Sequence, residues 1–318
     1  MTESSYHTPI MLREVLELIK PERCRVTVDG TLGGGGHSEG ILERLPEGAV
    51  HFGIDRDEEA VRAASERLVK YKNFHPIHGN FFDMRELVPL AEYGFSGADG
   101  IILDLGVSSH QLDDGSRGFS YGIEAPLDMR MDKSAPLSAY DVVNTYSSKR
   151  LFEIIKDYGE ERFASRIANA ICAKREARPI ETTTELAEII KSAIPAPARR
   201  EGPHPARRTF QAIRIEVNGE LEGLGTAVRN AAELLAPDGV LAVITFHSLE
   251  DRVVKNVFRE LKNPCTCPPS APICVCGKKP LADILTPKPI VAGDGELEAN
   301  PRARSAKLRA VKRTHNDL

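Results

Sequence analysis

The chain has 318 residues, of which 41% are hydrophobic and 28% are charged. This composition excludes global disorder, and the length suits one large or two ordinary domains. The 42 Lys and Arg residues against 46 Asp and Glu residues give a net charge of −4, which excludes a uniformly basic nucleic-acid coat but leaves room for a local basic patch. No apolar run approaches the roughly 18 residues that span a bilayer. With no signal pattern at the start and six cysteines, we expect a cytoplasmic protein without a membrane partner.

The first third of the chain alternates strand-like and helix-like segments. Short apolar runs predict strands at Arg25 to Asp29, Val50 to Ile54, Phe74 to Ile77 and Gly100 to Leu105. Helical spacing predicts helices at Met11 to Ile19, His37 to Leu45 and Asp57 to Lys70, the last with Asp57 as its N-cap. This order predicts a parallel sheet that is covered by helices.

The pattern changes between about residues 113 and 208, where we find helices and loops but no convincing strand. Helices are predicted at Leu151 to Tyr158, Glu161 to Lys174 and Thr184 to Ser192, followed by a Pro- and Arg-rich loop at Pro195 to Arg208. The α/β pattern then returns, with a helix at Glu216 to Leu235, a turn at 237–239, a strand at Val240 to Phe246 and a helix at Leu249 to Leu261. We therefore predict an α/β domain of residues 1–112 and 213–318, interrupted by an inserted all-helical domain of residues 113–212.

A glycine-rich run from Asp29 to Ser38 follows the first predicted strand and opens a helix. Glycines at such a junction allow a ligand to approach the backbone closely. The run lacks the Gly-Lys-Ser/Thr ending of a P-loop, and it suits NAD, FAD or S-adenosylmethionine (SAM) alike. Asp55 ends the next strand, where a carboxylate accepts hydrogen bonds from ribose hydroxyls. Phe81, just past the third strand, either packs on an adenine face or belongs to the core.

Asp104 follows the fourth predicted strand, beside the ligand crevice expected for such a sheet. Its carboxylate is placed to accept a hydrogen bond from an exocyclic amine or from the cofactor, with Ser108 and Ser109 assisting. The Asn/Asp-Pro-Pro-Tyr string of standard DNA N-methylases is absent at this position. After the predicted insertion, His247 either contacts substrate or packs in a strand–helix turn with Ser248 as the N-cap.

Nine strings, in chain order, carry a resemblance to a known family. They are Asp-Gly-Thr-Leu-Gly-Gly-Gly-Gly-His-Ser (29–38), Asp-Leu-Gly-Val-Ser-Ser (104–109), Gln-Leu-Asp-Asp (111–114), Arg-Gly-Phe-Ser (117–120), Pro-Leu-Asp-Met-Arg-Met-Asp (126–132), Tyr-Gly-Glu-Glu-Arg-Phe-Ala (158–164), Thr-Phe-Gln-Ala-Ile-Arg-Ile (209–215), Phe-His-Ser-Leu-Glu-Asp-Arg (246–252) and Asn-Pro-Arg-Ala-Arg-Ser (300–305). Over nearly its whole length, the chain resembles the ribosomal RNA small subunit methyltransferase H family, also called MraW. The resemblance implies a Rossmann-like class I SAM-dependent methyltransferase fold with an inserted helical domain that holds RNA.

The resemblance also implies an activity and a set of site residues. The family transfers a methyl group from SAM to N4 of a cytidine in the decoding region of bacterial 16S rRNA, so the expected partner is the small ribosomal subunit. A homodimer is compatible with the sequence. We expect no metal in the active site and no general base, and we assign Asp104, Ser108 and Ser109 to catalysis. The expected cofactor-binding residues, with Gly34 added from the glycine run, are Gly34, Gly35, Gly36, His37, Asp55, Phe81, Asp104 and Gln111.

Three alternative functions stay open from the residues alone. The first is SAM-dependent N-methylation of another substrate, DNA or protein, although the missing Asn-Pro-Pro-Tyr string and the helical insertion disfavour DNA. The second is an NAD-dependent oxidoreductase, which shares the glycine run and Asp55, and which binding of SAM rather than NAD would exclude. The third is a non-catalytic ribosome-assembly factor, which binds rRNA without transferring a methyl group.

Two further features lie outside these motifs. Basic residues gather around His204 and again from Arg302 to Arg313, where they suit either phosphate contacts with RNA or a solvated face. A Cys-x-Cys pair at Cys265 and Cys267 is followed by a second at Cys274 and Cys276. Four thiolates in two close pairs suit a structural zinc ion, and the alternatives are free thiols or redox-labile disulfides.

Overall fold

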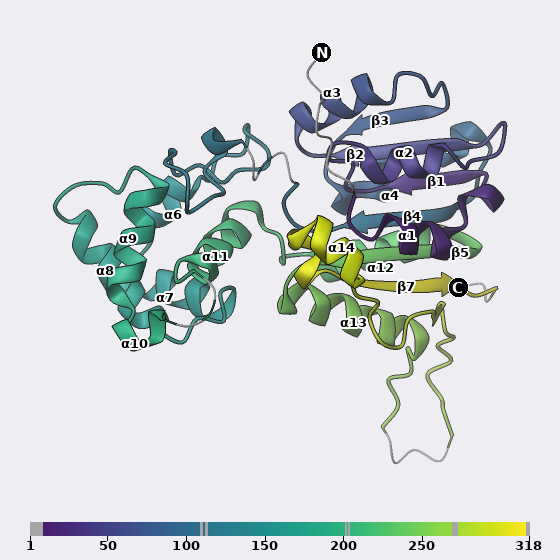
Figure 1. Ribbon diagram of the computed structural model, residues 1–318. Helices are drawn as coiled ribbons and strands as arrows, with labels where there is room; N and C mark the ends of the chain where they lie inside the picture. Colours follow the sequence, from purple (N-terminus) through teal and green to yellow (C-terminus); the bar gives the residue numbers. More distant parts are fainter. Residues whose placement is uncertain are drawn as a thin grey trace. The chain divides into compact units, whose positions relative to one another are not determined.

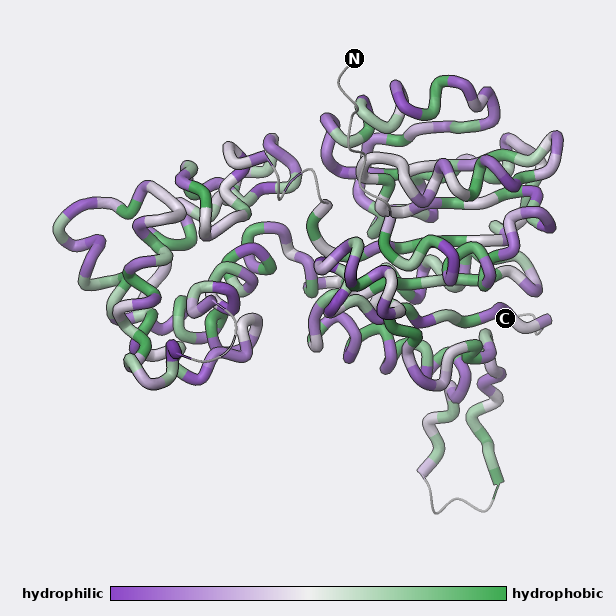
Figure 2. The backbone as a smooth tube through the Cα atoms, in the orientation of Figure 1, coloured by the Kyte–Doolittle hydropathy of each residue, from purple (hydrophilic) through white to green (hydrophobic). Residues whose placement is uncertain are grey.

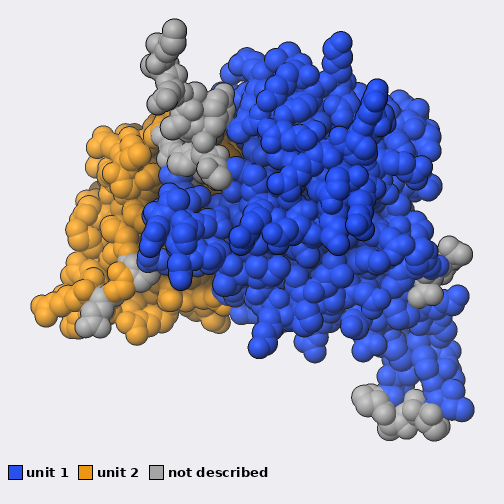
Figure 3. Space-filling model, turned by 45° about the vertical axis from the view of Figure 1, so that its right-hand side comes forward, with its two compact units in different colours: residues 1–106, 222–318 blue, residues 107–221 orange. Residues whose placement is uncertain are grey.

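The computed structural model describes residues 9–108, 111, 114–200, 202, 204–268 and 273–315. The chain forms two compact units, drawn in blue and orange in Figure 3. Unit 1 comprises Met1–Gly106 and Glu222–Leu318, and unit 2 comprises Val107–Leu221, which extends past both ends of the predicted insertion. Among the described residues, no helix is long and apolar enough to cross a membrane.

Within its described residues, unit 1 contains a seven-stranded sheet with the order β3-β2-β1-β4-β5-β7-β6 (Figure 1). The strands are β1 (Val26–Asp29), β2 (Val50–Asp55), β3 (Phe74–His78), β4 (Ala98–Asp104), β5 (Leu235–Thr245), β6 (Ala282–Ile284) and β7 (Lys307–Arg313). Strands β1 to β5 pair in parallel, whereas β7 runs antiparallel to both of its neighbours. The predicted α/β fold class with a parallel sheet is confirmed, apart from the antiparallel strand β7.

Helices cover both faces of this sheet. They are α1 (Leu12–Ile19), α2 (Gly36–Leu42), α3 (Glu58–Arg67), α4 (Met84–Leu87), α12 (Leu224–Leu234), α13 (Ser248–Lys262) and α14 (Asp294–Ala299). Side chains alternate between the faces along a strand. In β5, the side chains of Val240, Ala242 and Ile244 join the core cluster that α1 supplies. Leu241 and Val243 are buried on the other face, where α12 and α13 pack. Figure 2 shows the apolar residues concentrated in these central strands.

Two predicted elements of unit 1 differ in the structure. The helix predicted from Glu216 to Leu235 is broken, because Gly219 and Gly223 have positive φ angles of 59° and 79° that a helix does not contain. The predicted turn at 237–239 lies inside β5, where the register with β4 shifts between Ala98 and Gly100. The predicted N-cap Asp57 is confirmed, since its carboxylate accepts the Glu59 N–H at 3.1 Å.

The described part of unit 2 is built from helices with a core of its own. Its α-helices are α6 (Ala139–Thr145), α7 (Ser148–Asp157), α8 (Ala164–Arg175), α9 (Thr183–Ala193), α10 (Ala196–Arg199) and α11 (Arg207–Asn218). The short helix α10 lies in the stretch that was predicted as a loop, so that prediction was too simple. One apolar cluster includes Leu151 of α7, Ile167 of α8 and Ile190 of α9. Unit 2 therefore has the separate hydrophobic core that an independent domain needs.

Charged side chains form hydrogen bonds within the segment of unit 2 that precedes α6. The Arg130 guanidinium donates to both carboxylate oxygens of Asp128 at 2.9 and 2.8 Å, and to the Ala135 carbonyl at 2.9 Å. Arg117 is buried and donates to the carbonyls of Arg130 and Met131. These contacts give Asp128 and Arg130 a structural role in this segment.

Strands β6 and β7 were not predicted from the sequence. In β7, the basic residues obscure the alternation of apolar and polar positions that is typical of a strand. Arg309 is buried and donates to Asp251 of α13 through Nε at 2.6 Å. Burial opposes ionisation of Asp251, but the hydrogen bonds and charge of Arg309 hold the pKa of Asp251 below its ordinary value. Arg313 donates to the backbone carbonyl of Leu235 at 2.8 Å. The two arginines therefore join elements of unit 1, and the buried Arg309 is not available for contacts with RNA phosphates.

We expect Arg309→Met to destabilise the protein by about 1–3 kcal/mol, because it removes both Arg309 hydrogen bonds to the Asp251 carboxylate and leaves only Lys307 Nζ, 3.4 Å away. The loss should shrink as pH falls from about 4 through the lowered pKa of Asp251, since the charged pair stabilises the fold fully above the unfolded pKa and loses this effect as the folded carboxylate is protonated. Urea unfolding of both proteins at pH 7 and at about pH 2 measures the difference. The control Arg302→Met alters an exposed side chain and should stay within about 0.5 kcal/mol. Equal losses in the two variants would contradict the prediction.

Candidate active site

Three carboxylates lie at one edge of the sheet in unit 1. Asp29, Asp55 and Asp104 are the last residues of β1, β2 and β4, and these three strands are parallel neighbours. Strands β1 and β4 are adjacent in the sheet but far apart in sequence, so the connections diverge between them. Ligands of open parallel sheets bind at such a point, outside the carboxyl ends of the strands.

The glycine-rich run forms the connection from β1 to α2. Gly33 and Gly35 have φ angles of 48° and 77°, in the left-handed region that glycine adopts without strain. A Cβ at Gly30 would lie 2.5 Å from Leu103 Cδ2, so this glycine is required by packing. A Cβ at Gly34 would have no described atom within 4 Å. The loop therefore lies tightly against the sheet at Gly30 and faces open space at Gly34.

Asp29 anchors this loop through a buried chain of polar side chains. Its carboxylate accepts the Thr31 N–H at 3.0 Å and the Ser38 hydroxyl at 2.8 Å. The Ser38 oxygen lies 2.9 Å from His51 Nε2, and His51 Nδ1 lies 2.8 Å from the Thr27 hydroxyl. Burial lowers the pKa of His51 to about 3 and raises the pKa of Asp29. The imidazole is therefore neutral at pH 7. No local pattern predicts this network, because its bonded side chains are 9 to 24 residues apart.

Asp55 fixes the same loop from the next strand. One carboxylate oxygen accepts the Gly33 N–H at 2.7 Å, and the other accepts the Asp57 N–H at 2.9 Å. Burial raises the pKa of Asp55, while these two backbone donors act in the opposite direction. A carboxylate has about four lone-pair sites, so the two oxygens of Asp55 retain acceptor capacity for further donors.

His37 and Asp104 form a pair that sequence reasoning did not anticipate, although both residues were predicted at the site. His37 Nε2 donates to the Ile10 carbonyl at 2.9 Å, and its Nδ1 lies 3.6 Å from Asp104 Oδ2. The Asp104 N–H donates to the Thr31 hydroxyl at 2.6 Å. Burial raises the pKa of Asp104 to about 6, and the nearby His37 moderates the rise.

The second oxygen of Asp104 is the most informative atom of the site. Asp104 Oδ1 is buried, and among the described residues it has no hydrogen-bond partner. An unsatisfied buried carboxylate oxygen costs about 1–3 kcal/mol or more, so such atoms in folded proteins call for an explanation. A donor on a bound ligand provides one.

Phe81 begins η2 (Phe81–Asp83), which follows β3 after Gly79 and Asn80. A Cβ at Gly30 would lie 3.2 Å from the Phe81 Cβ, so this aromatic residue borders the end of β1. Its ring makes an edge contact with Phe82 at 4.9 Å between centroids. Phe81 is half-buried, and the structure thus brings it to the same edge as Asp29.

Three predicted site residues do not lie in the described part of unit 1. Ser108 and Gln111 belong to unit 2, where the Ser108 N–H donates to the Gln111 side-chain oxygen and the Gln111 N–H donates to the Ser108 hydroxyl, at 3.1 and 3.2 Å. Ser109 lies outside the described residues. The cofactor contact of Gln111 and the catalytic contacts of both serines stay predictions.

His247 caps the helix that follows β5. Its Nδ1 accepts the Glu250 N–H at 3.3 Å, while the Glu250 carboxylate accepts the His247 N–H at 3.3 Å. This reciprocal capping box makes His247 the N-cap of α13. The prediction of Ser248 as N-cap was wrong by one residue, because Ser248 already begins the helix.

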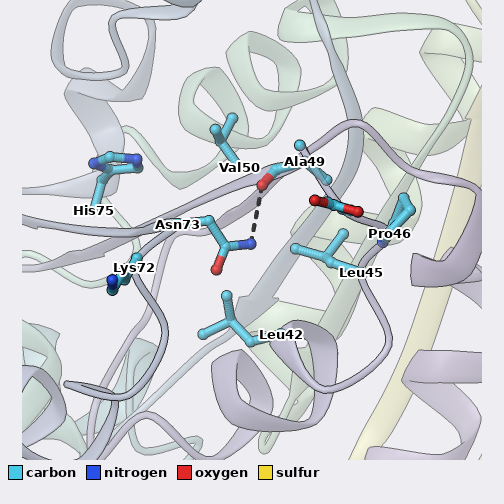
Figure 4. Close-up of a pocket in the computed structure, with 10 residues that line it drawn as sticks. Leu42, Leu45, Pro46, Ala49, Val50, Lys72, Asn73 and His75 are labelled. Carbon is cyan, nitrogen blue, oxygen red and sulfur yellow. Dashed lines mark hydrogen bonds between the residues drawn. The ribbon is translucent and has the colours of Figure 1, made fainter.

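A surface pocket at the opposite edge of the sheet is separate from this site. Figure 4 shows Leu42, Leu45, Val50, Asn73 and His75 around it. Val50 begins β2, whereas Asp55 ends it, so the length of the strand separates the pocket from the carboxylate edge. The Asn73 side chain donates to the Ala49 carbonyl at 2.9 Å and is part of the local packing.

Comparison with known proteins identifies the family to which this chain belongs. A family model described as the MraW methylase family matches residues 4–314. A ribosomal RNA small subunit methyltransferase H from Clostridium botulinum (strain Kyoto / Type A2) is 54% identical over 307 residues, which cover 96% of this chain and 98% of that protein. The protein of the same name from Ruminiclostridium cellulolyticum is 51% identical over 310 residues, with the same coverage of each chain. The chain belongs to the MraW methylase family.

Membership in the MraW methylase family confirms the predicted family and enzyme class. The protein is a SAM-dependent methyltransferase, and the oxidoreductase alternative is excluded. The open space at Gly34 and the unsatisfied Asp104 Oδ1 suit the presence of a ligand at this edge.

The buried polar chain behind the glycine loop generates a testable prediction. Ser38→Ala removes the hydroxyl that joins Asp29 to His51, so the buried Asp29 carboxylate loses a donor and the buried His51 Nε2–H loses its acceptor. We expect a loss of about 1–3 kcal/mol in unfolding free energy, measured by urea denaturation. The control Ser65→Ala removes a hydroxyl that bonds to the carbonyl of Val61 in its own helix, and it should cost less than about 0.5 kcal/mol. A Ser38→Ala protein as stable as the control would show that the chain carries no net stabilisation.

Proposed function

We propose that this chain transfers a methyl group from SAM to N4 of a cytidine in the decoding region of bacterial 16S rRNA, within the small ribosomal subunit. The names of the relatives support the substrate class, since both are small-subunit rRNA methyltransferases. The proposed compartment is the cytoplasm, where ribosomal subunits are assembled. Association into a homodimer stays a prediction.

The observation that carries the proposal is the buried, unsatisfied Asp104 Oδ1 at the edge where parallel strands bind ligands. An exocyclic amine of a base is a hydrogen-bond donor of the kind that this oxygen lacks. The lone pair of cytosine N4 is delocalised into the ring, so the amine is a weak nucleophile. A carboxylate acceptor localises that lone pair on nitrogen and stabilises the positive charge that develops there during transfer.

SAM supplies an activated methyl sulfonium when it is bound, so the protein needs to position rather than activate the methyl group. In our proposal, Asp55 accepts hydrogen bonds from the ribose hydroxyls with its remaining lone pairs. Gly34 leaves room for the cofactor beside the loop that it forms with Gly35 and Gly36, and Phe81 packs on the adenine. His37 favours the ionised form of Asp104, because its Nδ1 lies 3.6 Å from Asp104 Oδ2.

Unit 2 is proposed to hold the RNA. The target base must leave its stack to reach a methyl group at the sheet edge, and an RNA-binding domain helps to supply the energy of unstacking. Ser108 and Ser109, at the start of this unit, are proposed to assist Asp104. The methylated amine loses its proton readily once charged, so no general base is assigned.

The function is tested by methyl transfer to small ribosomal subunits from cells that lack the enzyme. Purified protein and labelled SAM are added, and the digested RNA is analysed by mass spectrometry. The proposal expects N4-methylcytidine that depends on active protein. Methylation of protein or DNA alone would move the function to another substrate, and binding of rRNA without methyl transfer would favour an assembly factor.

The proposed role of Asp55 predicts a specific effect on cofactor binding. Asp55→Asn removes the charge and one acceptor, and it should weaken SAM binding by about 10–100-fold in calorimetric titrations. The matched control is Asp99→Asn, because Asp99 also accepts two backbone N–H groups, those of Arg25 and Val26, at the opposite edge of the sheet. The control should bind SAM as the parent does. Equal affinities for SAM in the two variants would disprove the role of Asp55.

The raised pKa of Asp104 predicts the pH dependence of the reaction. The carboxylate is the acceptor form, and because its pKa is about 6, single-turnover methyl transfer should rise with pH through that value. Asp104→Asn should lower the rate by roughly 10²–10³-fold and remove this acidic limb.

The same variant separates the two roles that the sequence left open for Asp104. If the carboxylate acts on the amine, SAM binding by Asp104→Asn stays near the parent value while transfer slows. If it only holds the cofactor, SAM binding weakens and the transfer rate at saturating SAM is retained. The second result would overturn the proposed role.

A further inference from the structure

Four of the six cysteines, none of which belongs to the methyl-transfer site, lie together in a single segment of unit 1. The segment joins the end of α13 to β6, and Figure 1 shows it extending away from the sheet. The Sγ atoms of Cys265, Cys267, Cys274 and Cys276 all lie within 4.8 Å of one another. From this cluster we infer a structural zinc site with four thiolate ligands.

The distances between the sulfur atoms match those around a tetrahedral metal ion. With Zn–S bonds of about 2.3 Å, neighbouring sulfurs of a ZnS₄ centre are about 3.8 Å apart. Cys274 Sγ lies 3.5 Å from Cys265 Sγ, 3.9 Å from Cys267 Sγ and 3.5 Å from Cys276 Sγ. The Cys276 and Cys265 sulfurs are 3.8 Å apart. Four of the six edges of the tetrahedron are therefore close to the expected length.

The same distances disfavour the two alternatives. A disulfide requires an S–S distance of about 2.05 Å and joins sulfurs in pairs, whereas Cys274 is about equally far from three partners. Free thiols need no common centre, yet these four converge on one. The Val275 N–H also points at Cys267 Sγ, at 3.4 Å, as backbone amides do at metal-bound thiolates.

This segment lacks the apolar core that normally orders a chain of its length. Between Leu261 and Leu281, which are buried and joined by a backbone hydrogen bond of 2.8 Å, none of the described residues is buried. Val275 is 84% exposed. Small segments without a core are ordered by disulfides or by a metal. A zinc ion would supply that order here, because its binding free energy becomes folding free energy.

The position of the cluster makes its role structural. Helix α13 begins at Ser248, next to the carboxyl end of β5, and its 15 residues extend about 22 Å before the cysteines follow. The cysteines therefore lie at the end of α13 that is remote from the carboxylate edge. Four cysteines also fill a tetrahedral site, as in structural rather than catalytic zinc centres.

The test is the metal content of the full chain, purified without a metal-affinity tag or chelator. We expect about one zinc per chain by mass spectrometry of the metal, and less than about a tenth of that in a Cys265→Ser, Cys274→Ser double variant. The control is Cys172→Ser, which alters a lone thiol of α8 and should keep the full zinc content. Cobalt added to the reduced, metal-free chain should give the absorption bands of tetrahedral thiolate coordination.

Two further measurements separate loss of zinc from loss of folding. SAM binding should be unchanged in the double variant, because the cysteines are remote from the glycine loop. Trypsin should cleave after Lys278 faster in that variant, whereas Lys279 precedes Pro280 and resists cleavage. Zinc retained by the double variant, no cobalt spectrum in the parent, or an intact mass that reveals disulfides would each overturn the inference.

Discussion

Three strand-terminal carboxylates at one edge of a parallel sheet are the constraint around which unit 1 is organised. Burial raises the pKa of Asp29, Asp55 and Asp104 alike, so each needs donors to stay charged. Asp29 takes its donors from Thr31 and Ser38, and Asp55 takes its own from Gly33 and Asp57. The glycine loop is folded by satisfying these two carboxylates. Asp104 keeps one oxygen that has no donor among the described residues, and a donor on a bound ligand would satisfy it.

The same arrangement explains why the glycines are where they are. A side chain at Gly30 would collide with Leu103 of the neighbouring strand, and the φ angles of Gly33 and Gly35 turn the chain back over the sheet. Only a backbone without side chains can pass this closely and still present its N–H groups to Asp55. Loop conformation and carboxylate burial therefore depend on each other, and a change in either should disturb cofactor binding.

Outside this edge, unit 1 depends on other kinds of interaction. The antiparallel strand β7 is tied to α13 by the buried pair of Arg309 and Asp251, so basic residues that looked like an RNA surface contribute to the fold. In the described part of the segment between α13 and β6, no residue between Leu261 and Leu281 is buried and no strand is formed, and converging thiols take their place. Unit 2 has its own apolar cluster, which fits a separate task from cofactor binding.

The sequence by itself determined the elements whose signals are local. The parallel strands, the glycine loop and the carboxylates that end β2 and β4 follow from hydrophobic runs and from the residues after them, because period and composition act over a few positions. Strands β6 and β7 were not predicted, because the charged residues of β7 obscure its alternation of apolar and polar positions. The contact of His37 with Asp104 and the chain from Asp29 through Ser38 to His51 were decided only by tertiary structure. Hydrogen bonds between residues distant in sequence depend on how the strands are ordered in space, and no local pattern encodes that order.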